Sequence, residues 1–264
     1  MRTLPLLALL ALAAAPVAAQ GIVIPLRCER ACAADGTPPR IAADRVEVWA
    51  AVYRGVAITH VDHHFHTVGA VEGAFFFPLP ADADVYGVSL YLDGGDEQHQ
   101  PWSDPGESQR MVDAIIRERP DAGLAPYRGA ALVHVPVRVP AAGAHRVQIS
   151  YAQPMTAHDG TFTYRYPLAA GGAAARAGHM TFGATVTTET GFRDLRSPTH
   201  AVDVEWGTEA GRCRPEAACG STTVGSQRVK IIRFTPSPGD RARDFELVYT
   251  PADSATARRN VSSP

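Results

Sequence analysis

Short stretches in which apolar and polar residues alternate follow one another along most of the chain. Val46, Val48, Ala50 and Val52 occupy every second position of one such stretch. Successive side chains of a strand point to opposite faces, so a period of two predicts a half-buried β-strand. Similar runs predict further strands at 56–65, 75–79, 86–92, 131–139, 147–151, 162–166, 182–188, 202–206, 229–234 and 245–249.

One segment has helical periodicity instead. Asp104 can cap a helix whose first residue is Pro105, and Glu107 follows at the third position. Apolar residues then recur on one helical face before Pro120 forces the helix to end. Many short strands with a single helix predict a mainly β fold: an antiparallel β-sandwich with one helix at about 104–119, plus a β-rich C-terminal continuation.

The N-terminus is typical of a secretory signal. Arg2 precedes an apolar run, and Val17-Ala18-Ala19 forms a small-residue cleavage site. We therefore expect a secreted or periplasmic protein. No later stretch has the roughly 18–20 apolar residues that a spanning helix needs, so no membrane span is expected after signal cleavage.

The rest of the chain divides by composition. Residues 169–178 are rich in alanine and glycine without periodicity, which predicts a flexible connection. The expected organisation is a signal at 1–19, a cysteine-containing segment at 20–40, a sandwich at 41–168, the connection at 169–178, the continuation at 179–250 and a disordered tail at 251–264.

Charge and composition exclude some classes of function. The net charge is −2, with 25 basic and 27 acidic residues, whereas nucleic-acid binders normally concentrate basic charge. A hydrophobic content of 45% supports an ordinary globular core. The chain has neither the glycine-rich Lys-Ser/Thr loop of nucleotide-binding proteins nor a His-Glu-x-x-His helix, and no cofactor is expected.

The four cysteines are Cys28, Cys32, Cys213 and Cys219. An oxidising compartment favours disulfides, and the spacings favour two local bridges, Cys28–Cys32 and Cys213–Cys219, over the two crossed pairings. Such short loops would pin a terminus and a loop without holding the core. A metal site built from all four thiolates is the alternative.

Several motifs occur in order along the predicted strands: Arg54-Gly55-Val56-Ala57, Val61-x-x-x-Phe65, Glu72-Gly73 and Phe77-Pro78-Leu79-Pro80. Their succession resembles the VIT domain (vault protein inter-alpha-trypsin domain). Later, Ser197-Pro198-Thr199-His200 and Asp244-Phe245-Glu246-Leu247 resemble the β-rich segment that leads, in bacterial relatives, to a von Willebrand factor type A domain. The resemblance runs from about Cys28 to Tyr249.

The chain departs from that family in three ways. His63 and Thr67 stand where relatives usually carry Gln and Asn, and the helix has Ser108 and Val112 in place of the usual alanine and tyrosine. The Asp-x-Ser-x-Ser metal motif of the type A domain does not occur in this sequence. Adhesion by that metal mechanism is therefore not expected.

The densest group of polar side chains is the run from His60 to His66. On a strand, His60, Asp62, His64 and His66 share one face, while Val61, His63 and Phe65 share the other. Imidazoles and carboxylates are ligands of zinc and copper, so the first set is a candidate metal site. The alternative, which the pattern favours, is a solvated sheet face.

Two other features have a structural and a functional interpretation. His200 and Ser197 do not form a nucleophile arrangement, so Ser197-Pro198-Thr199-His200 is interpreted as a turn in which hydroxyls and imidazole bind backbone groups.

Trp49 lies opposite the valine face of its strand. Large aromatic residues mostly serve packing, which favours a core position; the alternative is an exposed binding patch with Tyr53.

The resemblance implies an exported, non-enzymatic VIT-domain protein that acts in protein–protein interaction, or as an adhesion accessory, at the cell envelope. Its partner would be another protein, with a separate type A domain protein as the candidate. Two alternatives stay open. One is a metal-binding protein or metalloenzyme that uses the 60–66 strand, and the other is a carbohydrate-binding sandwich that uses Trp49 and Tyr53.

Overall fold

The structure, a computed structural model, describes residues 21–28, 41–80, 82–120, 122–169, 178–207, 228–237 and 239–252. Within these ranges the chain is mainly β with one α-helix, as the sequence predicts. The elements are β1 (Ile22–Cys28), β2 (Ile41–Ala42), β3 (Arg45–Tyr53), β4 (Val56–Thr67), β5 (Val71–Pro78), β6 (Asp84–Leu92), β7 (Glu97–His99), α1 (Pro105–Glu118), β8 (Leu132–Val139), β9 (Gly143–Pro154), β10 (Phe162–Tyr166), β11 (His179–Thr188), β12 (Phe192–Arg196), β13 (Asp203–Gly207), β14 (Arg228–Phe234) and β15 (Phe245–Pro251).

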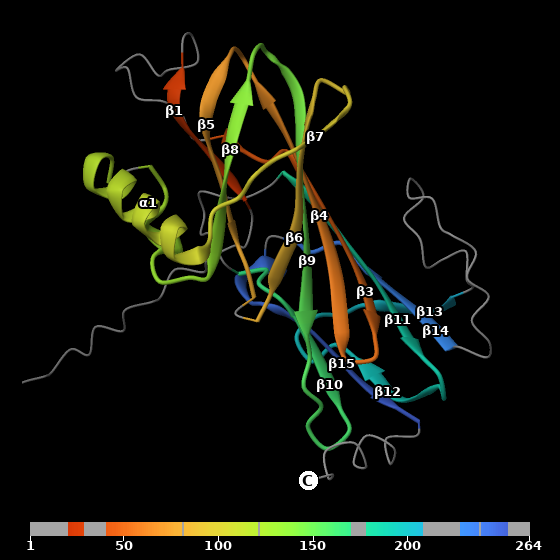
Figure 1. Cartoon of the computed structure of the whole chain (residues 1–264). Coiled ribbons are helices and arrows are strands. Elements are labelled where there is room, and N and C mark those ends of the chain that lie inside the picture. The colour runs from red at the N-terminus through yellow and green to blue at the C-terminus, as the bar shows by residue number, and fades with distance from the viewer. Residues whose placement is uncertain are drawn as a thin grey trace, which may run out of the picture.

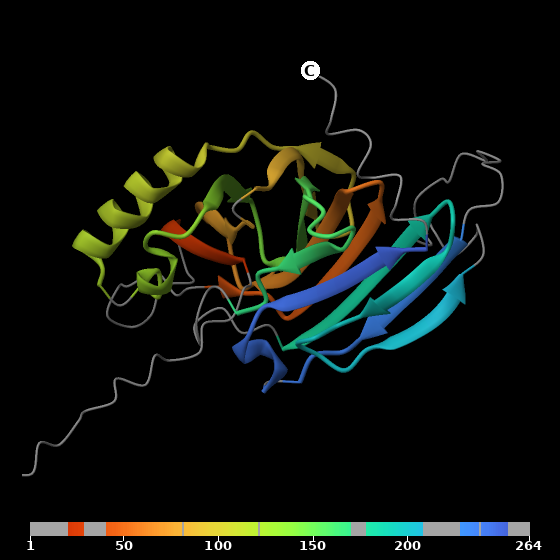
Figure 2. The same ribbon diagram turned by 90° about the horizontal axis from the view of Figure 1, so that it is seen from below.

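The strands form three open sheets (Figures 1 and 2). The large sheet has eight strands in the order β13-β14-β11-β3-β4-β9-β6-β7, and the two small sheets have the orders β2-β1-β5-β8 and β10-β15-β12. Every pairing is antiparallel except that of β3 with β11, which is parallel. The predicted sandwich is therefore built on a mixed sheet.

Both small sheets pack on the same face of the large sheet, which we call its inner face. From the first, Phe77 contacts Tyr151 of β9 with ring centroids 6.3 Å apart. From the second, Phe245 contacts Phe182 of β11 with ring centroids 4.4 Å apart. One continuous hydrophobic core joins the three sheets, and its apolar burial drives their association.

Strand β3 shows why the alternating pattern was informative. Val46, Val48, Ala50 and Val52 are at most 3% exposed and face the core, while the residues between them are half-buried or exposed. In β6, Tyr86, Val88, Leu90 and Leu92 occupy alternate positions, which predicts that they share one face. That prediction is wrong for Tyr86, because a register shift between Val85 and Gly87 turns it outward.

Helix α1 forms and ends as its sequence predicts. The Asp104 carboxylate accepts a hydrogen bond from the Glu107 backbone N–H at 2.8 Å. The apolar side of the helix covers the face of the β1-β5-β8 sheet that points away from the large sheet, in a second core with Ile22, Ile24 and Phe76. Arg119, just past the helix, donates to the Pro25 carbonyl at 3.1 Å.

Several predictions fall outside the described residues. These are the signal at 1–19, most of the connection at 169–178 and most of the tail at 251–264. Of the cysteines, Cys28 is described only as a backbone position in β1, and Cys32, Cys213 and Cys219 lie outside, so both bridges stay predictions. In the part of the chain that is described, no helix has the length and apolar character of a membrane span.

Candidate functional site: the outer face of the large sheet and its histidine cleft

The two faces of β4 differ as the sequence predicts. Val61, His63 and Phe65 are at most 2% exposed and point into the core. His64 and His66 are accessible on the opposite, outer face of the large sheet. Asp62 is the exception on that face, because its side chain is fully buried.

A network of neighbours from β9 and β6 buries Asp62. Gln148 donates an amide hydrogen bond to one carboxylate oxygen at 2.8 Å, and the Arg146 guanidinium lies 3.5 Å from the same oxygen. Arg146 also lies over the Tyr91 ring, with its guanidinium carbon 3.8 Å from the ring centroid. Ion pairing and cation–π contact together fix the guanidinium, so this polar network is preorganised.

Each histidine of the outer face has a different partner. The pairs are His60 Nδ1 with Ser150 Oγ at 2.7 Å, His64 Nε2 with Glu47 Oε2 at 3.3 Å, and His66 Nδ1 with Asp44 Oδ2 at 2.6 Å. The sequence run therefore places these side chains on one face, but the sheet register distributes them among separate contacts.

The end of this face is hollowed into a cleft of about 510 Å³, which we call the histidine cleft. Cross-strand pairing aligns Arg45, His64, Arg146 and Tyr91 in one row along its wall. Burial and the neighbouring Arg45 lower the pKa of His64, and burial lowers the pKa of His145. Both changes favour the neutral imidazole in the cleft.

The metal site stays a prediction, and the geometry limits which residues it could use. Residues four apart on a strand are about 13 Å apart, so His60 and His64 cannot bind the same ion. Asp62 is already bound by Gln148 and Arg146. Among the described residues, no three His, Cys, Asp or Glu side chains are grouped as metal ligands would be.

The middle of the outer face is mainly apolar, with the exposed Asp84 beside Ala152 at its β6 edge. We call Trp49, Ala51, Val56, Ile58, Tyr86 and Ala152 the apolar patch; they lie in neighbouring strands β3, β4, β9 and β6. Val56 is 41% and Tyr86 is 51% exposed. The Tyr86 ring meets the His60 ring edge-on, with centroids 6.4 Å apart, which places Tyr86 over this face.

The prediction that Trp49 lies in the core is wrong. This residue is half-buried on the outer face, and its ring lies against Gly183 of β11, where an added Cβ would be 2.3 Å from a ring atom. A glycine at this position therefore makes room for the indole. Tyr53 lies further along β3, where its hydroxyl donates to Glu189 at 3.0 Å.

The Ser197-Pro198-Thr199-His200 corner has the structural role that its sequence predicts. The His200 backbone N–H donates to Ser197 Oγ at 3.1 Å, and the imidazole Nε2 contacts the Asp240 carbonyl at 2.9 Å. Thr199 Oγ1 accepts from the Glu246 backbone N–H at 2.9 Å. These bonds tie the corner to the start of β15.

Four buried tyrosines were not singled out from the sequence: Tyr151, Tyr164, Tyr166 and Tyr249. They lie between the large sheet and the β10-β15-β12 sheet, where Tyr164 exchanges a hydrogen bond with Thr59 at 3.0 Å. Burial raises the pKa of each phenol, so all four stay neutral, and their rings act as core residues.

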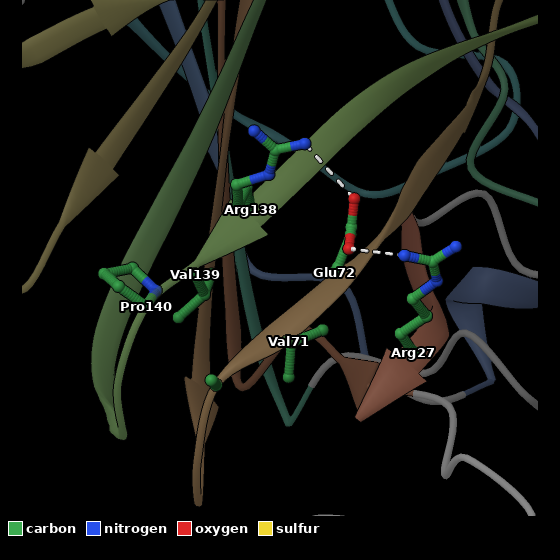
Figure 3. Close-up of a pocket in the computed structure, with 7 residues that line it drawn as sticks. Arg27, Val71, Glu72, Arg138, Val139 and Pro140 are labelled. Atoms are coloured by element: carbon green, nitrogen blue, oxygen red, sulfur yellow. Dashed lines mark hydrogen bonds and ion pairs between the residues drawn. The ribbon is translucent and has the colours of Figure 1, made fainter. Parts of the chain in front are cut away.

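A second hollow, of about 430 Å³, lies at the end of the β1-β5-β8 sheet (Figure 3). Arg27 and Arg138 flank the Glu72 carboxylate there, at 3.9 Å and 3.2 Å. Sequence inspection missed it, because its charged residues come from three distant strands.

No protein-family model and no curated protein matches this chain. Among solved structures it is similar to a Legionella pneumophila protein described as a "putative nutrient binding protein", at 11% sequence identity. The match covers 92% of this chain and 73% of that chain, with a TM-score of 0.45. A similarity of this size assigns neither a family nor a function.

Proposed function

We propose that this chain is an exported binding module that docks a folded partner protein on the apolar patch of its outer sheet face, and acts by binding rather than catalysis. The observation that carries the proposal is the contrast between the two faces of the large sheet. Two further sheets cover the inner face, whereas Val56 and Tyr86 on the outer face stay 41% and 51% exposed. Contiguous exposed apolar surface is typical of interaction sites.

The composition of the patch supports a protein as the occupant. Aromatic residues such as Trp49 and Tyr86 act as anchors in protein interfaces, and aliphatic side chains such as Ile58 exclude water around them. Across four strands and three rows of residues, the patch measures about 14 Å by 14 Å. That is the size of an interface centre, because a standard interface covers about 800 Å² on each partner.

Charged groups surround the patch at both ends of the strands. On one side lie Glu47, His64 and Arg146, next to the histidine cleft. On the other, Arg54 and Glu189 form an ion pair. A polar rim of this kind supplies orientation and specificity, while the apolar centre supplies affinity.

The sequence resemblance to VIT domains suggests the kind of partner. In that family the module adjoins a type A domain. We therefore propose a type A domain protein at the cell envelope as the partner. The histidine cleft at the rim would then contact the partner and hold no catalytic group.

Site-specific photo-crosslinking tests the docking face. A crosslinking residue at Val56 should give one discrete adduct in envelope extract, and the same residue at Val68 should not. Val68 is a matched control, because it is 80% exposed but lies beyond the end of β4. Ile58→Asp places a charge in the patch without touching the core, and it should abolish the adduct.

The partner identified in this way must then bind directly. Purified, it should bind the parent chain, and Ile58→Asp should weaken the interaction by at least about tenfold, since interface anchors contribute 1 kcal/mol or more. Val68→Asp should leave the affinity unchanged. Equal adducts at positions 56 and 68, or undiminished binding by Ile58→Asp, would refute the proposal.

A further inference from the structure

Three charged side chains form a cross-strand row at the end of the small β1-β5-β8 sheet. Arg27 of β1 is opposite Glu72 of β5, and Glu72 is in turn opposite Arg138 of β8. Figure 3 shows the two guanidinium groups on either side of the carboxylate. On the same face of the sheet, helix α1 packs on the neighbouring apolar residues, which include Ile24 and Phe76.

A β-bulge creates this row. The register of β1 with β5 shifts between Pro25 and Arg27, so that Leu26 has no partner and Arg27 lies opposite Glu72. With a regular register, Leu26 would occupy that place and Arg27 would point to the other face. Bulges re-aim side chains and are over-represented next to functional sites.

The row has more positive than negative charge. Two guanidiniums share one carboxylate, and each arginine side chain is 84% exposed. A third guanidinium, Arg119, is held at the Pro25 carbonyl two residues before Arg27, at 3.1 Å. Each guanidinium has five N–H donors, so Glu72 leaves most of those on Arg27 and Arg138 available.

An apolar wall adjoins the charges. Ala70 and Pro140 form the accessible apolar side of the hollow, whereas the side chains of Val71 and Val139, which also line it, belong to the main core on the opposite face of the sheet. At about 430 Å³ the hollow is in the size range of small-molecule sites. Guanidiniums beside an apolar wall match a carboxylate that carries a short apolar chain.

We infer that this hollow is a binding site for such a carboxylate, with Arg27 and Arg138 holding the charged group and Pro140 contacting the chain. The ligand is a free organic acid or the C-terminal carboxylate of a peptide that ends in an apolar residue. Glu72 positions the two arginines and at the same time weakens binding through its like charge. The site lies on a different sheet from the proposed docking face and does not depend on it.

Titration calorimetry at low salt tests the inference, because exposed charges are screened at higher ionic strength. The probes are hexanoate and acetyl-Ala-Leu, each compared with its neutral amide. We expect at least one of the two carboxylates to bind and neither amide to do so. Hexanoate binding would identify a free acid as the ligand, and binding by the peptide alone would identify a chain terminus.

Variants assign the binding to the row. Arg138→Gln should weaken it by about tenfold, because it removes a charge-assisted hydrogen bond. Glu72→Gln should strengthen it, which a merely structural ion pair would not do. Arg165→Gln is the matched control, since Arg165 is an exposed arginine that pairs with Glu246 on another sheet. The inference is wrong if neither carboxylate binds, if the amides bind equally well, or if Arg138→Gln and Arg165→Gln have the same effect.

Discussion

His63 should make the stability of this protein depend on pH. Its ring is fully buried between Phe75 and Phe77, with centroids 4.9 Å and 5.3 Å away, and its Nε2 accepts from the Gly21 backbone N–H at 3.3 Å. Burial, with a smaller effect from His64, lowers the pKa of His63 to about 3 from an ordinary value of 6.5. The folded chain therefore holds this imidazole neutral at pH values where the unfolded chain protonates it.

The magnitude follows from proton linkage. Above the unfolded pKa of 6.5 neither state binds the proton, and the contribution to stability is complete. Below it the unfolded state gains a proton that the folded state refuses, so stability falls with pH until the folded pKa near 3 is reached. Between about pH 7.5 and about pH 5, His63 alone should lower the free energy of unfolding by about 2 kcal/mol.

Urea unfolding of the parent and of His63→Gln at both pH values measures this contribution. Glutamine can still accept from Gly21 but does not titrate, so the variant should lose about 2 kcal/mol of the pH difference. Burial also lowers the pKa values of His64, His134 and His145. The pH-dependent loss of stability that these three residues cause should remain in the variant. His99→Gln, which removes an 85% exposed ring, is the control and should keep the parent's pH difference. An unchanged pH difference in His63→Gln would refute the reasoning.

Two further changes test packing and capping. Gly183→Ala should displace the Trp49 indole, lower stability by about 1–3 kcal/mol and red-shift the tryptophan fluorescence, because the new Cβ overlaps the ring. The matched control is Gly87→Ala in the same sheet, where the nearest atom would lie at an ordinary 3.7 Å; a similar loss there would contradict the overlap. Asp104→Ala should lower stability by about 1 kcal/mol in urea unfolding, because it removes the N-cap of α1, and Asp104→Ser should restore most of it. No loss in the alanine variant would show that the cap contributes little.

Local sequence patterns predicted the helix and the strands well, because residues close together in the sequence determine where each helix or strand forms. The valines of β3 and the Asp104 cap of α1 both lie where their spacing indicates. The alternation of β4 likewise predicted which side chains face the core. Such periodicities depend only on backbone geometry, which every residue of an element shares.

The site could not be predicted in the same way, because its contacts cross between strands. Asp62 was a candidate metal ligand by sequence, but its partners Gln148 and Arg146 come from β9, more than 80 residues away. Only the register of β4 with β9 shows that its carboxylate is already engaged. Similarly, the bulge at Leu26 gives no local signal, although it decides where Arg27 points.

The parallel pairing of β3 with β11 bears on how fragments of this protein should be designed. The two strands are about 130 residues apart in the chain, yet they are neighbours at the centre of the large sheet. A fragment that stopped at residue 168 would leave the full length of β3 with unpaired amides and carbonyls, and a long bare edge of this kind invites self-association. Expression boundaries placed after Thr188 would retain β11 and protect β3. Aggregation of a shorter fragment would therefore be caused by the absence of β11 beside β3, and not by a defect in the residues that the fragment contains.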